Sequence, residues 1–256
     1  SAGVPFPQQG WTWEQLRETA QQTTRGDEVG LHATAWTPLV QSYLRQRSGE
    51  DWLRDEQAMT EALQFFSTMI FTDRSAPPGP RPGQSTALMR REFQQGRAAM
   101  SLESLSDLQA GSRMIRFAWD VAPYPTLPGG DGAPLIGYTG YALSATAPNP
   151  DAAWEFLRFA AGPEGAEALV RAGYLPAYRT DGAKTAWFGR QPSPPPGTEA
   201  LFTTPWRFER PGEWSSPHGQ AVRQVIANAL SGHQPLEEAL IHFRQALEHL
   251  QDADPH

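Results

Sequence analysis

Apolar residues recur at helical spacing in several parts of the chain. In residues 55–71, Met59, Leu63, Phe66 and Ile70 follow one another at intervals of four, three and four positions. This spacing places them on one face of a helix, and a stripe of this kind is usually part of a core. Further helices are predicted at residues 13–23, 85–94, 105–111, 150–161, 166–171, 220–230 and 235–250.

Two of these helices carry clear start signals. Thr12, with Gln15 three positions later, has the pattern of a capping box before the first helix. Asn149 followed by Pro150 is a typical N-cap with proline in the first turn. The helix that starts at Pro150 is expected to bury one face, made of Ala152, Ala153, Phe156, Leu157 and Ala160.

The central stretch, residues 117–144, alternates extended segments with glycine and proline. Strands are predicted at 119–123 and 141–144, with a loop rich in proline and glycine between them. Further strands are expected at 31–36 and 98–102. A stiff loop edged by aromatic residues suits holding a small ligand, but it could equally be a long surface connection between two core strands.

Composition narrows the classes of function. Of 256 residues, 39% are hydrophobic and the net charge is −7, which is typical of a folded protein and unfavourable for binding nucleic acid or an anionic membrane. There is no cysteine, so disulfides, thiolate metal sites and a cysteine nucleophile are excluded. The first residue is Ser1 rather than methionine, so we expect a processed or trimmed product.

Motifs for catalysis or cofactor binding are missing. The six histidines do not have the spacing of a metal site, since His242 and His249 are two helical turns, roughly 10 Å, apart. The patterns GxSxG, GxxxxGK[ST] and GxGxxG do not occur. We therefore expect neither a catalytic centre nor a metal or cofactor.

Aromatic residues in glycine- and proline-rich loops are the main candidates for ligand contact. Aromatic faces stack on the C–H faces of sugars, while neighbouring carboxylates, amides and arginines bind hydroxyl groups. Each aromatic taken alone could instead belong to the core. The candidates are Trp36, Tyr138, Tyr141, Trp187 with Phe188, and Trp206 with Arg207.

Four stretches, in this order, resemble the extracellular solute-binding proteins of sugar-type ABC transporters, the group that includes maltose-binding proteins. Residues 10–16, GWTWEQL, resemble the family's P-x-T-W-[DE]-E-L, and residues 93–100, FQQGRAAM, are similar to F-x-x-G-K-A-A-M. Residues 121–144 resemble V-A-P-x-P followed by G-G-x-x-x-A-I-S. Residues 149–165, with LPA at 175–177, resemble N-P-E-A-A-W-E-F-L-K-F-L-x-S-P-E-G and its x-L-P-A.

The resemblance implies an α/β fold of the type II periplasmic-binding-protein kind, mostly the C-terminal lobe plus segments crossing to the N-terminal lobe. Residues 1–120 would form mainly the second, C-terminal lobe. Residues 121–170 would cross toward the first lobe, and residues 171–256 would return to the second lobe and end in the C-terminal helices. It also implies a periplasmic or extracellular protein, either free or membrane-tethered in the full-length precursor. Such a protein binds a carbohydrate between the lobes without changing it and docks on an ABC permease.

This chain departs from the family pattern in two respects. The strand–helix–strand block that opens the first lobe has no counterpart here, so the chain is a fragment, or a missing N-terminal segment or second chain completes the lobe, or the lobe is reduced. The family's frequent N-G-S-W is replaced by Glu103-Ser104-Leu105-Ser106. The aromatic residue that the family has at that point is absent, so either the ligand differs or another tryptophan takes its place.

We expect the predicted binding residues to contact a sugar in different ways. The aromatic residues would stack, Glu103 and Ser104 would bind hydroxyls, and backbone N–H groups near Gly140 would donate. Three alternatives stay open: a phosphorylated polyol or other anion held by Arg207, a glycoside-processing enzyme with paired carboxylates, and an interaction domain without a small ligand. The full predicted set is Trp36, Glu103, Ser104, Tyr138, Gly140, Trp206 and Arg207.

Overall fold

The computed structural model describes residues 3–33, 35–80, 91–102, 114–130, 135–136, 140–190, 194–204, 207–208, 212 and 215–253. Its helices are α1 (Trp13–Thr23), α2 (Thr37–Ser48), α3 (Glu56–Ser67), α4 (Arg91–Gln94), α6 (Pro150–Ala161), α7 (Pro163–Arg171), α8 (Asp181–Phe188), α9 (Ala200–Thr203), α10 (Pro217–Leu230) and α11 (Leu236–Ala253). Shorter helical turns are η1 (Gly49–Asp51), the π-helical η2 (Thr68–Thr72) and η3 (Pro196–Glu199). The strands are β1 (Val29–Ala33), β2 (Ala98–Leu102), β3 (Leu135–Ile136) and β4 (Arg207–Phe208).

The strands form two parallel pairs, β1 with β2 and β3 with β4. In the first pair Val29 lies opposite Ala98 and Ala33 opposite Leu102. Helix α1 packs so tightly on β1 that a Cβ added to Gly30 would lie 1.8 Å from the Ala20 carbonyl oxygen. Glycine is therefore required at position 30 for α1 to approach the strand.

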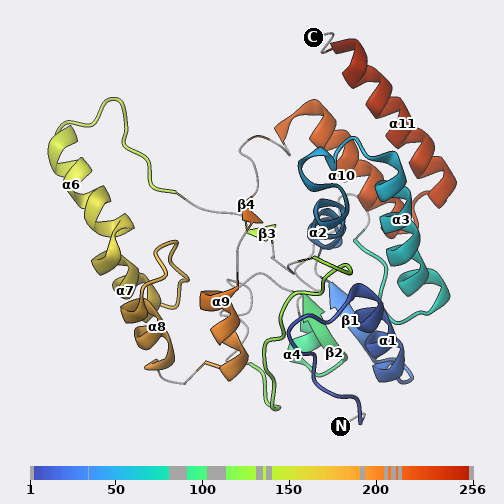
Figure 1. Ribbon diagram of the computed structural model, residues 1–256, viewed down its shortest axis with the longest axis horizontal. Helices are drawn as coiled ribbons and strands as arrows, with labels where there is room; N and C mark the ends of the chain where they lie inside the picture. Colours follow the sequence, from blue (N-terminus) through green and yellow to red (C-terminus); the bar gives the residue numbers. More distant parts are fainter. Residues whose placement is uncertain are drawn as a thin grey trace.

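Most of the buried side chains form one core, the N-terminal core, built from α1, β1, α2, α3, α10 and α11. The stripe predicted for α3 is confirmed, since Met59, Leu63 and Phe66 are all fully buried. Helices α10 and α11 pack on each other and on α3, so the C-terminal end of the chain returns to the N-terminal core (Figure 1). The bounds of α1 and its capping box between Thr12 and Gln15 are also confirmed.

A second, smaller core lies in the group formed by α6, α7, α8 and α9, which stands apart from the N-terminal core in Figure 1. Its buried centre is Val170, Ala183 and Trp187, with Leu201 and Phe202 packed against it. Helices α8 and α9 belong to this group, and α10 belongs to the N-terminal core. Which group belongs to which lobe of a complete fold stays a prediction.

The structure does not contain the two strands predicted in the central stretch. Residues 119–123 and 141–144 form no strand, and the regular pairing in this stretch is β3 with β4. A strand needs a neighbouring backbone, whereas the Pro123 carbonyl accepts from a side chain, the Trp11 indole, at 2.7 Å. The predicted helix 105–111 lies outside the described residues, as does most of the helix predicted at 85–94.

The predicted buried face of α6 is also partly wrong. Ala160 is buried, but Phe156 is 61% exposed and Ala152 is exposed. The sequence pattern is amphipathic as expected, yet no described residue covers this side of the helix.

His32, on β1, should make folding sensitive to mild acid. Its side chain is 1% exposed and its Nδ1 has no hydrogen-bond partner. Burial lowers the pKa of His32 below its usual value of about 6.5, and the nearby Glu92 carboxylate offsets this only in part. Since the unfolded chain then binds the proton more readily than the folded chain, stability should fall as the pH drops below about 6.5, by up to about 1.4 kcal/mol per pH unit.

Urea unfolding at pH 7.5 and pH 5.0 measures this dependence. We expect His32→Gln to lose less stability than the unsubstituted chain between the two pH values. The control is His233→Gln, at an exposed position, which should keep the original pH dependence. An equal loss in His32→Gln and in the unsubstituted chain would contradict the prediction.

Candidate functional site

Three of the predicted binding residues follow the carboxyl ends of β1 and β2 closely along the chain. Ala33 and Leu102 end the paired strands opposite each other, and the chain runs on from them to Trp36 on one side and to Glu103 and Ser104 on the other. In open α/β folds ligands bind beyond the carboxyl ends of parallel strands. Glu103 and Ser104 follow Leu102 in the sequence and lie outside the described residues.

Trp36 is a core residue in this structure. It is 3% exposed, and its ring packs against Phe66 with 5.7 Å between centroids. Gly79 lies so close that an added Cβ would be 3.0 Å from the indole Cδ1. The indole Nε1 is buried with no hydrogen-bond partner. Trp36 therefore has no open stacking face here, and its place in a ligand cleft stays a prediction.

Arg207 lies beside the central stretch. It is half-buried in β4, opposite Leu135 of β3. The chain leaves β3 at Ile136 and reaches Gly140 four residues later. Gly140 is exposed, with open space where a side chain would project. The structure thus places Arg207 opposite Leu135, five positions before Gly140 in the sequence.

The two remaining predicted residues, Tyr138 and Trp206, lie outside the described residues. Tyr138 comes two positions after β3 and Trp206 directly before β4 in the sequence.

The expectation that loop aromatics are exposed holds for Tyr141 and fails for Trp187. Tyr141 is 55% exposed. Trp187 is 2% exposed because it belongs to α8 rather than to a loop, and its Nε1 donates to the Thr198 hydroxyl at 3.0 Å. Phe188, at the end of the same helix, is half-buried. The glycine after Phe188 indicates the end of a helix here and not a binding loop.

Sequence reasoning missed a polar clamp around Gln46 of α2. The Gln46 Oε1 accepts from the Trp13 indole at 3.1 Å and from the Leu127 backbone N–H at 2.8 Å, while its Nε2 donates to the Pro125 carbonyl at 3.0 Å. These three bonds tie the proline-rich residues 123–127 to α1 and α2. An amide side chain is suited to this, because it can accept and donate at once.

Backbone and tyrosine contacts complete the clamp. Trp13 and Thr126 form a backbone bond at 3.3 Å, and the Thr126 N–H donates to the Trp11 carbonyl at 2.9 Å. Tyr124 packs edge-on against Trp13, and burial raises the pKa of Tyr124 to about 12, with a hydrogen bond to Ser42 that lowers it in part. The phenol is therefore neutral at physiological pH. The entry to the central stretch is thus fixed to the N-terminal core.

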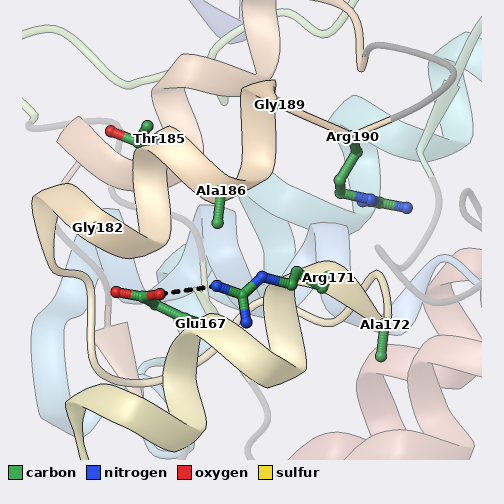
Figure 2. Close-up of a pocket in the computed structure, with 8 residues that line it drawn as sticks. All are labelled: Glu167, Arg171, Ala172, Gly182, Thr185, Ala186, Gly189 and Arg190. Atoms are coloured by element: carbon green, nitrogen blue, oxygen red, sulfur yellow. Dashed lines mark hydrogen bonds and ion pairs between the residues drawn. The ribbon is translucent and has the colours of Figure 1, made fainter.

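An open hollow of about 660 Å³ lies between α7 and α8 (Figure 2). On the α7 side, Arg171 donates to Glu167 of the same helix at 3.0 Å. The Arg190 guanidinium lies 4.8 Å from the Trp187 ring centroid. Small residues leave the space between the helices, and no aromatic side chain lines it. The hollow offers polar groups for hydroxyls but no stacking face, and none of Trp36, Gly140 and Arg207 lines it.

Metal ligands do not converge anywhere in the part of the chain that the structure describes, since no three His, Asp or Glu side chains there could hold one ion. Within the same residues, no helix has both the length and the apolar character needed to cross a membrane.

Comparison with known proteins gives a consistent result. The family model described as bacterial extracellular solute-binding protein matches residues 1–167. No curated protein matches the chain. Among solved structures, a sugar transporter from Rhizobium etli in an open conformation superposes with a TM-score of 0.72 at 20% identity, covering 96% of this chain and 66% of that one.

Two further structures show the same fold. An ABC substrate-binding protein from Listeria monocytogenes in complex with cycloalternan has a TM-score of 0.70 at 18% identity, covering 98% of this chain and 66% of that one. UgpB from Mycobacterium tuberculosis in complex with glycerophosphocholine has a TM-score of 0.69 at 19% identity, with 98% and 65% covered. The predicted α/β fold, a partial periplasmic-binding-protein fold, is confirmed, and the chain spans about two thirds of the length of these structures.

Proposed function

Because this chain belongs to the bacterial extracellular solute-binding protein family, we propose that it is a substrate-binding component of an ABC importer and binds a mono- or oligosaccharide without changing it. The family match over residues 1–167 carries the proposal. The protein would act in the periplasm or outside the cell, either free or membrane-tethered in the full-length precursor, and deliver its ligand to a permease.

The proposed site extends from the carboxyl edge of β1–β2 to the β3–β4 pair. In this proposal Glu103, Ser104 and Arg207 bind hydroxyls, and backbone N–H groups near Gly140 donate. Tyr138 and Trp206 supply aromatic faces, whereas Trp36 is buried against Phe66 in this structure and would have to be uncovered to do so. A ligand that touches both sides of the cleft favours the closed state by its higher affinity for that state.

Isothermal titration calorimetry tests the proposal. A protein that contains both lobes should give saturable heat with at least one neutral sugar from a panel of mono- and oligosaccharides. The same samples, incubated with chromogenic glycosides, should release no chromophore. Absence of heat with every sugar, or turnover of a glycoside, would contradict the proposal.

A phosphorylated polyol or other anion is the second candidate ligand, supported by the half-buried Arg207 beside the central stretch. UgpB, which shares the fold, is solved with glycerophosphocholine, a phosphate ester. Arg207→Ala distinguishes the two ligand classes. A neutral sugar should lose about tenfold in affinity, the value of one hydrogen bond, whereas an anion that depends on this guanidinium should lose about a hundredfold or more.

The same calorimetry on Arg171→Ala provides the control. This arginine lines the hollow of Figure 2 and already pairs with Glu167, so its removal should leave the affinity unchanged. Unchanged affinity in Arg207→Ala would remove Arg207 from the site.

A further inference from the structure

Trp36 carries a buried polar group that the fold does not use. The side chain is 3% exposed, and its Nε1, an N–H donor, has no hydrogen-bond partner among the described residues. Two other buried indoles, those of Trp13 and Trp187, donate to Gln46 and to Thr198. A buried donor without an acceptor costs free energy. The environment of Trp36 is therefore less favourable than one that offers its N–H an acceptor.

A short segment covers the edge of the indole that carries this N–H. A Cβ added to Gly79 would lie 3.0 Å from the Trp36 Cδ1 and 3.8 Å from its Nε1. Phe66 also contacts the indole, but it belongs to the fully buried stripe of α3 and is fixed in the N-terminal core. Gly79 belongs to residues 77–80, which we name the 77–80 strap. The strap is thus the cover of Trp36 that lies outside the core helices.

The chain before the strap is firmly anchored. Ser75 is buried, its carbonyl accepts from the Leu31 N–H of β1 at 2.9 Å, and its N–H donates to the Met69 carbonyl at 3.0 Å. Arg74 has a φ of 54°, in the left-handed region that residues other than glycine rarely adopt. Surrounding contacts must hold a residue in such a conformation. Ala76, which follows Ser75, is 3% exposed and belongs to the N-terminal core.

The strap itself is held much more weakly than its anchor. Its sequence is Pro-Pro-Gly-Pro, so Gly79 is the one residue of the four with a backbone N–H to donate. That N–H donates to the carbonyl of Leu230, the last residue of α10, at 2.9 Å. Pro78 is exposed and the other three residues are half-buried. A segment with one backbone donor and little buried surface can open locally while the core stays folded.

We propose that the 77–80 strap closes over Trp36 in the absence of sugar and moves away from it, beyond the anchor at Ser75, when a sugar binds. Opening breaks the bond between Gly79 and Leu230 and uncovers the indole N–H. The N–H then donates to a sugar hydroxyl, and the ring stacks on sugar C–H groups. Because opening uses part of the binding free energy, the closed strap lowers the apparent affinity. This inference rests on the proposed sugar binding and adds the segment that uncovers Trp36.

Hydrogen exchange followed by NMR, without sugar, tests whether the strap opens. The Trp36 indole N–H should exchange about a hundredfold or more faster than that of Trp13, because local opening needs less free energy than unfolding of the core. Trp13 is buried to the same degree but bonded to Gln46. The Gly79 amide should likewise exchange faster than the Leu31 amide, which is bonded to the anchor. Exchange at Trp36 as slow as at Trp13 would overturn the proposal.

A substitution in the strap tests whether one motion uncovers both groups. Pro78→Gly should speed exchange of the Trp36 indole N–H and of the Gly79 amide by the same factor, about two- to fivefold, because glycine gains more conformational freedom than proline in the open strap. The matched control is Pro5→Gly, at another exposed proline, which should change neither rate. Unchanged rates in Pro78→Gly, or a change at Gly79 alone, would show that the strap does not gate Trp36.

The same exchange measurement with sugar present tests the role in binding, with glucose and the other sugars of the calorimetric panel as probes. A sugar that gives saturable heat should speed exchange of the Gly79 amide about tenfold or more, because it makes a minor open state the main one. Pro78→Gly should bind that sugar about two- to fivefold more tightly. Saturable heat with unchanged exchange at Gly79 would overturn the inference and leave the proposed function intact. Absence of heat with every sugar would contradict the proposed function, while exchange without sugar still decides whether the strap opens.

Discussion

Trp13→Ala should lower the free energy of unfolding by about 3–5 kcal/mol, the usual cost of truncating a buried tryptophan to alanine. Trp13 is 2% exposed in the N-terminal core. Its ring lies 5.7 Å from those of Tyr43 and Phe66 and 5.6 Å from that of Tyr124, measured between centroids. The substitution removes these contacts and leaves a cavity. The loss is a large fraction of a typical stability of about 5–15 kcal/mol.

Urea unfolding followed by circular dichroism measures the change. The matched control is Trp154→Ala, the same substitution at a side chain that is 56% exposed on α6, which should cost less than about 0.5 kcal/mol. Trp13→Phe should fall between the two, because it keeps an aromatic ring but loses the indole N–H that binds Gln46. Equal effects at Trp13 and Trp154 would show that the first tryptophan is not central to the core.

Local signals in the sequence predicted the N-terminal part of the fold well. The capping box of Thr12 and Gln15 gave the start of α1, and the spacing of Met59, Leu63 and Phe66 gave the buried side of α3. The motif around residues 93–100 correctly placed β2 at Ala98–Leu102. These features succeed because each depends on neighbours a few residues away.

The failures have a common physical cause, which is dependence on distant partners. Phe156 was expected to be buried because α6 is amphipathic, but burial requires a second layer that the described residues do not supply. The segment 119–123 was expected to be a strand. Instead, the carbonyl of its last residue, Pro123, accepts from the Trp11 side chain, 112 positions away in the sequence, and the Pro125 carbonyl accepts from the Gln46 side chain, 79 positions away. No local pattern reports such contacts.

The candidate site was predicted less well than the fold. A tryptophan near proline, such as Trp36, has the same local sequence whether it covers a ligand or packs under Gly79. The path of the segment that contains Gly79, more than forty positions later in the chain, decides between ligand contact and burial. The parallel register of β1 with β2 and of β3 with β4 is likewise invisible in the sequence.

Gln46→Leu is expected to destabilise the fold by about 2–3 kcal/mol and to loosen residues 123–127. Leucine nearly matches the volume of glutamine but makes none of its three hydrogen bonds, to Trp13, Leu127 and Pro125. The partly buried indole N–H, backbone N–H and carbonyl are then left without partners, which costs more than the bonds themselves contribute. Urea unfolding gives the stability change, and hydrogen exchange of the Leu127 amide, measured by NMR, should accelerate more than that of amides in α3.

Two comparison variants separate the clamp from a general effect of the substitution. Gln220→Leu makes the same change at an exposed side chain with one local bond, to the Ser215 carbonyl, and should change stability by less than about 0.5 kcal/mol. In a double-mutant cycle with Trp13→Phe, the combined loss should be smaller than the sum of the single losses, because both substitutions break the same bond between the indole and Gln46. Additive losses would show that Gln46 does not couple α1 to the central stretch. We therefore expect residues 123–127 to move with the N-terminal core in any domain motion of this protein.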